Sequence, residues 1–284
     1  MNMNIKIKAT VIIGIIIFLL SSCNKRDPYD YCSKGFECYK NKEYKLAIKY
    51  YTKAIDINNK DALFYFARGM AYDSLVRREL AIADYTSAIK YDNKHSRAYC
   101  NRGIDYLKSN EYDKAISDFE MAIKIDSVFI KPYFKLAEIY REKDNYDLST
   151  KYLSKIIEID SLNARAYSER GVDFLDQQRY KDAISDLTIA IRLEPNNVRS
   201  YSHRGMAYTY LGNVKLALQD INKCIEINPN RSLSYFTQAG IYRRFKNDEK
   251  VIADLKKSAD LGLVDAKSAL KEYYNINYQT VKER

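Results

Sequence analysis

The chain has 284 residues, and its 47 lysines and arginines exceed its 37 acidic residues to give a formal net charge of +10. It contains 27 tyrosines, no tryptophan and only two histidines, and its sequence has no HExxH, CxxC, glycine-rich phosphate loop or Ser-His-Asp spacing. The sequence therefore predicts neither an enzyme nor a metal or cofactor site.

Residues 1–22 have the pattern of an export signal. Lys6 and Lys8 precede an apolar run over residues 9–20, which is short for a helix that spans a bilayer but suits the core of a secretory signal. The run ends in the segment 20–23 with the sequence LSSC. This ending resembles the bacterial lipoprotein box, in which small residues precede a cysteine that receives a diacylglyceryl group.

The resemblance implies that residues 1–22 are cleaved, that Cys23 carries the lipid, palmitate included, and that residues 23–27 form a tether. Loss of the two leader lysines lowers the formal net charge from +10 to +8. An uncleaved N-terminal anchor is the alternative, and either form attaches the protein to a membrane. Each buried methylene contributes about 0.8 kcal/mol, so several acyl chains make a durable anchor. We expect a bacterial cell envelope, with the outer membrane favoured and the leaflet open.

A period of 34 residues runs through the rest of the chain. Seven sites at this spacing carry a small residue, each with a tyrosine four residues before it and most with an aromatic residue three after it. Large residues one turn on either side of a small one define a helix face. The seven sites are Gly35, Gly69, Gly103, Ala137, Gly171, Gly205 and Ala239.

A second helix is predicted after the first in each repeat. Mostly small residues stand 12 and 19 positions after each of the seven sites, with a bulky residue between them. Two antiparallel helices approach closely only where their side chains are small, which explains the small residues on both. Polar turns separate the helices, and Pro195 and Pro229 fall between repeats, where proline ends a helix without disrupting one.

This arrangement resembles the tetratricopeptide repeat, whose 34-residue unit has aromatic, small, aromatic, alanine, bulky and alanine positions in this order. The resemblance implies an all-α, right-handed superhelical solenoid of about seven helix-turn-helix repeats over residues 28–264, followed by a capping helix and frayed tail over residues 265–284. Repeat 4 has Ala137, Ser149 and Ile156 where its neighbours mostly have Gly, Ala and Ala. We therefore expect its helices to be spread or tilted, dividing the array into two blocks of three. The repeats begin near residues 28, 62, 96, 130, 164, 198 and 232.

An arginine and an aspartate occur together in four repeats. The arginine directly precedes the glycine, the aspartate follows 16 residues after the arginine, and repeats 1 and 4 lack both. We interpret them as structural ion pairs, either between the two helices of one repeat or across to a neighbouring repeat. The pairs are Arg68 with Asp84, Arg102 with Asp118, Arg170 with Asp186, and Arg204 with Asp220.

In proteins of this kind the first helix of each repeat lines a concave groove. The position six residues before the glycine site carries four consecutive cations, Arg97, Lys131, Arg165 and Arg199, and neighbouring rows supply apolar side chains. We predict that an acidic segment binds there with its carboxylates paired to these cations. A solvated charged rim is the alternative. The predicted apolar anchors are Phe66, Phe134 and Met70.

Two functions stay open at this point. The first is a membrane-anchored, non-enzymatic scaffold that binds a protein or peptide segment with acidic character. The second is a structural or glycan-associated accessory lipoprotein of an uptake or cell-wall system. The basic charge of an exported chain favours acidic protein segments or anionic headgroups over nucleic acid. The sequence leaves the identity of the partner and the oligomeric state open.

Overall fold

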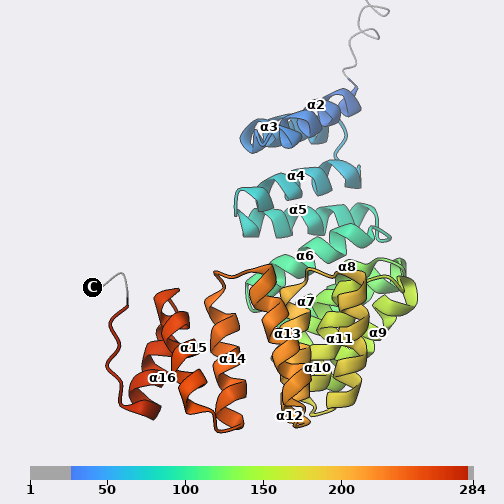
Figure 1. Cartoon of the computed structure of the whole chain (residues 1–284). Coiled ribbons are helices and arrows are strands. Elements are labelled where there is room, and N and C mark those ends of the chain that lie inside the picture. The colour runs from blue at the N-terminus through green and yellow to red at the C-terminus, as the bar shows by residue number, and fades with distance from the viewer. Residues whose placement is uncertain (1–26, 281–284) are drawn as a thin grey trace, which may run out of the picture. The chain divides into compact units, whose positions relative to one another are not determined.

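The computed structural model describes residues 27–280 of the chain (Figure 1). Fifteen helices and no strand occur in these residues, which confirms the predicted all-α repeat solenoid. The predicted leader, Cys23 and residues 281–284 lie outside the described part. The helices are α2 (Pro28–Lys40), α3 (Tyr44–Ile57), α4 (Ala62–Ser74), α5 (Arg78–Tyr91), α6 (Ser96–Lys108), α7 (Tyr112–Ile125), α8 (Ile130–Glu142), α9 (Tyr146–Ile159), α10 (Ala164–Asp176), α11 (Tyr180–Leu193), α12 (Val198–Tyr210), α13 (Val214–Ile227), α14 (Ser232–Arg244), α15 (Asp248–Asp260) and α16 (Val264–Tyr274).

The helices belong to two compact units, which comprise residues 27–127 and residues 128–280 of the described range. The first unit contains the helix pairs α2 to α7, and the second contains the pairs α8 to α15 followed by α16 (Figure 1). The boundary between Ser127 and Val128 precedes repeat 4. Repeat 4 therefore groups with the last three repeats. The sequence predicts instead that repeat 4 separates two blocks of three repeats.

Each repeat turns between its two helices through one residue in the left-handed region of φ. Six of these residues have a side chain and φ values of 55 to 63°, whereas Gly212 has a φ of 77°. A side chain is strained in this conformation, most of all when it is β-branched. The residues recur every 34 positions and are Lys42, Val76, Asn110, Asp144, Gln178, Gly212 and Lys246.

Small residues lie where the two helices of a repeat cross, as predicted. A Cβ atom at Gly35 would lie 2.6 Å from the ring of Tyr51, and one at Gly171 would lie 2.7 Å from Cγ of Leu187. Both distances are shorter than a van der Waals contact, so these crossings need glycine. Ala137 is buried at the same position of repeat 4.

The tail after α16 packs against the last repeat. Ile276 and Tyr278 contact the apolar cluster of α15 and α16. The backbone amide of Ile276 donates to the carbonyl of Leu270 at 3.0 Å, and the Tyr278 hydroxyl donates to Oδ2 of Asp260 at 3.0 Å. The described part of the tail is therefore held in place, which differs from the frayed tail that we expected.

The four predicted arginine–aspartate pairs form within their own repeats. Nε and Nη2 of each arginine donate to the two carboxylate oxygens of its aspartate at 2.7 to 3.0 Å. Nη1 donates at 2.9 to 3.1 Å to a Thr or Ser hydroxyl on the second helix of the preceding repeat. Two aromatic rings flank each guanidinium with their centroids 5.7 to 5.9 Å away. Each arginine thus ties its repeat to the one before it.

Repeat 7 keeps the aspartate of this arrangement and lacks the arginine. Gln238 occupies the arginine position, and its amide donates to Oδ1 of Asn222 at 2.8 Å. Oδ2 of Asp254 is buried and has no hydrogen-bond partner among residues 27–280. Burial raises the pKa of Asp254 to about 6, and nearby Lys250 limits the rise. The last repeat therefore holds a poorly compensated carboxylate.

Candidate binding site

The predicted groove residues are divided between the two units. Phe66, Met70 and Arg97 lie on α4 and α6 of the first unit, where Arg97 is exposed and the other two are half-buried. The remaining predicted residues lie on α8, α10 and α12 of the second unit. Three of them, Phe134, Arg165 and Arg199, line one cavity there, whereas Lys131 is exposed and does not line it.

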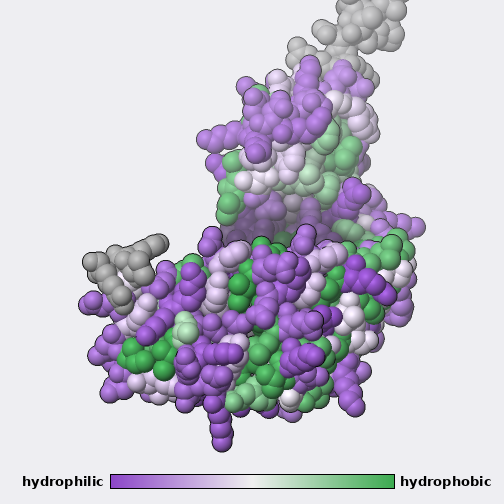
Figure 2. Space-filling model, in the orientation of Figure 1, coloured by the Kyte–Doolittle hydropathy of each residue, from purple (hydrophilic) through white to green (hydrophobic). Residues whose placement is uncertain are grey.

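This cavity of the second unit has a volume of about 380 Å³ and is rich in charged side chains. Four cations and two anions line it, with Ala137 and Leu153 as buried apolar neighbours. Hydrophilic residues also cover much of the visible surface of the α8 to α16 region, with hydrophobic patches between them (Figure 2). The charged residues of the cavity are Lys135, Glu138, Arg141, Arg165, Glu169 and Arg199.

Arg165 is the cation with the most freedom to bind a ligand. Its guanidinium lies over the ring of Phe134, with the guanidinium carbon 4.3 Å from the ring centroid. Such stacking uses the face of the guanidinium and leaves the N–H groups at its edge available. The side chain is exposed and makes no hydrogen bond or ion pair with any residue that the structure describes.

A network of charged groups holds the other two arginines of the cavity. Arg141 on α8 forms ion pairs with Glu169 and Asp173 on α10, and its Nη2 also donates to the backbone carbonyl of Glu169 at 3.1 Å. Nη1 of Arg199 on α12 donates to Oε1 of Glu169 at 3.1 Å. The Ser149 hydroxyl of α9 donates to Oδ2 of Asp173 at 2.5 Å. The network therefore links four helices of this unit.

Burial and neighbouring cations shift the pKa values of Glu169 and Asp173. Burial alone would raise the pKa of Glu169, but the hydrogen bond and charge of Arg141 and the charges of Arg199 and Arg165 outweigh it, so the pKa is lowered. Burial raises the pKa of Asp173, and hydrogen bonds from Arg141 and Ser149 offset part of that rise. Glu169 is therefore ionised at neutral pH and acts as a fixed negative charge in the cavity.

Four members of this network, Arg141, Ser149, Glu169 and Asp173, were not among the residues predicted from the sequence to form a site. The sequence does contain one sign of a buried ion pair at Asp173. The equivalent position carries Ala or Ile in four other repeats, and an acid at an apolar position needs a partner. Ser149 is one such partner of Asp173, and it stands where five other repeats have alanine. Glu169 stands at a position where the other repeats have Ser33, Ala67, Asn101, Lys135, His203 and Thr237, so no repeated pattern marks it.

His203 belongs to the same row as Glu169 and is half-buried. Its Nδ1 atom is buried and has no hydrogen-bond partner among the described residues. Burial and then the charge of Arg199 lower the pKa of His203 to about 4, so the imidazole is neutral at pH 7.

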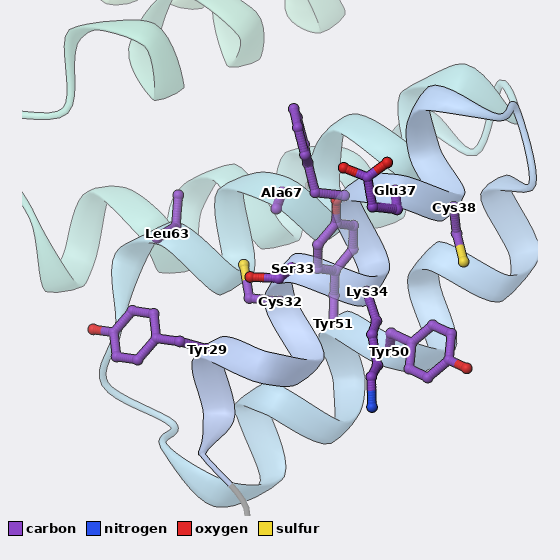
Figure 3. Close-up of a pocket in the computed structure, with 11 residues that line it drawn as sticks. Tyr29, Cys32, Ser33, Lys34, Glu37, Cys38, Tyr50, Tyr51, Leu63 and Ala67 are labelled. Atoms are coloured by element: carbon purple, nitrogen blue, oxygen red, sulfur yellow. The ribbon is translucent and has the colours of Figure 1, made fainter.

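The first unit has an apolar pocket at the same repeat positions. It measures about 780 Å³, and its lining includes Cys32, Ser33, Phe36 and Leu63 where the charged cavity has Phe134, Lys135, Glu138 and Arg165. Figure 3 shows the Tyr51 ring near the centre of the lining residues, with Tyr29 and Leu63 on one side and Cys38 on the other. The two units therefore offer different chemistry at equivalent positions.

Residues 27–280 contain no group of three or more His, Cys, Asp or Glu residues that could hold a metal ion. Their helices also include none with the length and apolar character that crossing a membrane requires. The four cysteines in this range are free thiols, namely Cys32, Cys38, Cys100 and Cys224.

Comparison with known families supports the repeat assignment. The tetratricopeptide repeat family matches five of the seven helix pairs, which together make up more than half of the chain. The matched residues are 31–61, 62–95, 96–127, 130–161 and 198–231. Repeats 5 and 7 have the same pair of helices in the structure. No curated protein matches the chain.

Several solved structures of tetratricopeptide repeat proteins have a similar fold. The C-terminal part of a TPR repeat-containing protein from Cytophaga hutchinsonii has a TM-score of 0.70 and 21% identity, covering 84% of this chain and 99% of that one. A tetratricopeptide repeat protein from Parabacteroides merdae has a TM-score of 0.61 and 18% identity, covering 86% and 97%. YrrB, described as a TPR protein with an unusual peptide-binding site, has a TM-score of 0.59 and 24% identity, covering 66% and 97%. At these identities the likeness concerns the fold alone.

Proposed function

We propose that this chain, which belongs to the tetratricopeptide repeat family, is a membrane-anchored lipoprotein of a bacterial envelope that acts as a non-enzymatic interaction scaffold. Its partner is a protein or peptide segment with acidic character, which binds in the charged cavity of the second unit. The observation that carries this proposal is the exposed Arg165 guanidinium, which is stacked on Phe134 and free of any ion pair in the described part of the chain.

The cavity has features that suit a peptide more than a small substrate. It is open at the surface of three successive first helices, α8, α10 and α12, so an extended segment can contact several repeats at once. Its polar groups are arginine, lysine and glutamate side chains, and its lining residues include no serine, threonine or cysteine nucleophile. A peptide ligand is also in keeping with YrrB, a protein of similar fold that has an unusual peptide-binding site.

The binding proposal is tested by joining the partner to the cavity in native membranes. A carbodiimide forms a zero-length amide bond between a lysine amine and a carboxylate. Lys135 pairs with Glu138, whose side chain is partly exposed, so the lysine amine should become joined both to Glu138 and to an acidic residue of the partner. We expect the crosslink of Lys135 to the partner, identified by mass spectrometry, in the wild type and its loss in Arg165→Glu. Lys151→Glu makes the same charge reversal at an exposed site of α9 and should retain the crosslink. Equal crosslinking of Lys135 to the partner in the wild type and Arg165→Glu would refute binding at this cavity.

The anchor is tested separately, because Cys23 lies outside the described residues. Replacement of Cys23 by serine should remove incorporation of labelled palmitate and block cleavage of residues 1–22, because the diacylglyceryl group is added before the leader is removed. A wild-type chain that keeps residues 1–22 and incorporates no palmitate would instead indicate an uncleaved N-terminal anchor. Separation of inner and outer membranes on a density gradient then tests the outer membrane, which we favour.

A further inference from the structure

We infer that Glu169 makes the charged cavity selective for a single carboxylate of the partner, seated on the guanidinium of Arg165. Glu169 is a carboxylate of the chain itself that already binds the other two arginines of the cavity. The inference rests on the proposed function and specifies the chemical group that the cavity accepts.

Arg141 cannot serve as a ligand seat. It forms ion pairs with Asp173 and Glu169, and its Nη2 donates to the backbone carbonyl of Glu169 at 3.1 Å. The side chain of Asp173 is fully buried, so withdrawal of Arg141 would leave an unpaired charge in the interior. Arg141 therefore holds the cavity together and is not available to a partner.

Arg199 is more accessible than Arg141, but its charge is already offset. Its Nη1 donates to Oε1 of Glu169 at 3.1 Å, and the Glu169 side chain is only 13% exposed, compared with 53% for Arg199. A partner that took Arg199 would have to compete with a carboxylate that the protein holds in place. Glu169 thus occupies the position that a second carboxylate of a partner would need.

One cation among the charged residues of the cavity and its network has no anion paired with it in the described chain. Lys135 pairs with Glu138 at 2.6 Å, Arg141 pairs with Asp173, and Arg199 pairs with Glu169. Arg165 is the remaining cation, and it has no ion pair among the described residues. A single negative charge on the partner therefore neutralises the cavity, and a dianion such as a phosphate monoester finds no second free cation.

The shape of the donor favours a carboxylate as well. The Arg165 guanidinium lies over the Phe134 ring, and two parallel N–H groups at the edge of a guanidinium match the two oxygens of a planar carboxylate. Glu169 is the only glutamate at its position among the repeats of the second unit. The equivalent residues of the other three repeats are Lys135, His203 and Thr237. The selective carboxylate is thus a local feature of this cavity and does not follow from the repeat itself.

Isothermal titration calorimetry with the full chain tests the inference with two capped tripeptides, acetyl-Leu-Glu-Leu-amide and its phosphoserine counterpart. The wild type should bind the glutamate peptide at least about tenfold more tightly, a difference of about 1.4 kcal/mol. Arg165→Lys keeps the charge but loses the planar fork, and should weaken binding of the glutamate peptide at least about tenfold. Lys151→Arg changes an exposed residue of α9 that does not line the cavity and should have no effect.

Two further variants separate the role of Glu169 from a merely structural one. Glu169→Gln should tighten binding of the phosphoserine peptide at least about tenfold, because Arg199 becomes a second free cation. Arg199→Gln should change binding of the glutamate peptide less than about threefold, because Arg199 is not the seat. Arg199→Gln alters an exposed side chain. It therefore still tests whether the peptide carboxylate binds Arg199, even if Glu169→Gln fails to fold.

The inference and the proposed function can fail separately. Tighter binding of the phosphoserine peptide by the wild type, an unchanged preference in Glu169→Gln, or a large loss in Arg199→Gln would overturn the selectivity. Failure of the wild type to bind either peptide would also overturn it, because one carboxylate is claimed to be sufficient. The proposed function would survive any of these results if Lys135 still forms its Arg165-dependent crosslink to a partner in membranes.

Discussion

Gln238 lies at the arginine position of repeat 7, yet its amide donates to Asn222 at 2.8 Å and leaves Oδ2 of Asp254 without a partner in the described chain. The surroundings of the missing arginine are largely present. Tyr235 and Tyr242 stand where aromatic rings flank the arginine in repeats 2, 3, 5 and 6. The last repeat therefore lacks one side chain of an arrangement that four other repeats complete.

Gln238→Arg should stabilise the protein at pH 7.5. The new guanidinium would pair with Asp254 as Arg204 pairs with Asp220, and we expect a gain of about 1 to 2 kcal/mol in the free energy of unfolding. Urea denaturation measures the gain. Lys246→Arg changes an exposed residue outside the pair and serves as control. A variant no more stable than the wild type would show that Asp254 does not need a cation.

The unpaired Asp254 should also make stability depend on pH. Its pKa rises from 3.8 to about 6, so the folded chain binds this proton more tightly than the unfolded chain does. The resulting stabilisation is complete below pH 4 and is lost as the pH rises through about 6.

Asp254→Asn removes this titration and should bring a gain over the wild type of about 1 kcal/mol at pH 7.5, with little gain at pH 4. Thermal unfolding across this range gives the comparison. Burial raises the pKa of Asp105 to about 6 as well, but that contribution is present in both proteins and cancels. A gain that stays constant between pH 4 and 7.5 would exclude Asp254 as the cause.

Val76→Gly should stabilise the first unit. Val76 is 77% exposed and has a φ of 59°, a conformation that a β-branched residue adopts only under strain. Repeat 6 has Gly212 at the same turn, where a Cβ would meet no atom within 4 Å. We expect a gain of about 1 kcal/mol, since relief of strain exceeds the entropy cost of glycine in the unfolded chain.

Gly212→Val is the matched reverse substitution and should destabilise the protein by a similar amount. Both free energies of unfolding can be measured by urea denaturation. Destabilisation by Val76→Gly would mean that the valine side chain makes contacts in solution that outweigh its strained backbone.

The fold was predictable from sequence to a larger extent than the candidate site. The spacing of small and aromatic residues fixes which positions of each helix meet, because the same contact recurs in every repeat. The pairing of Arg68 with Asp84 was visible for the same reason, since three other repeats have an equivalent pair.

Interactions that occur once in the chain carry no such periodic signal. The contacts of Glu169 with Arg141 and Arg199 connect repeats 4, 5 and 6 at different positions of the repeat. A row of equivalent positions, such as Arg97, Lys131, Arg165 and Arg199, identifies residues on one face. It does not show which of them are already paired. In the second unit Arg199 is paired with Glu169, whereas Arg165 has no ion pair among the described residues.

Ser149→Ala tests this difference between repeat pattern and structure, because the two predict opposite results. Five other repeats have alanine at this position, so the pattern alone favours the substitution. In the structure, however, the Ser149 hydroxyl donates to the buried carboxylate of Asp173 at 2.5 Å. Loss of this donor should cost about 1 to 3 kcal/mol in the free energy of unfolding, as expected for a buried charged acceptor that loses a hydrogen bond.

Thr150→Ala is the matched control for Ser149→Ala, since the Thr150 hydroxyl donates only to the nearby backbone carbonyl of Asp147 at 3.0 Å. We expect it to change the free energy of unfolding by less than about 0.5 kcal/mol. In a double-mutant cycle, Ser149→Ala should cost much less when Asp173 is already replaced by asparagine, because the buried acceptor charge is gone. Equal costs in the two backgrounds would show that Ser149 stabilises repeat 4 independently of Asp173.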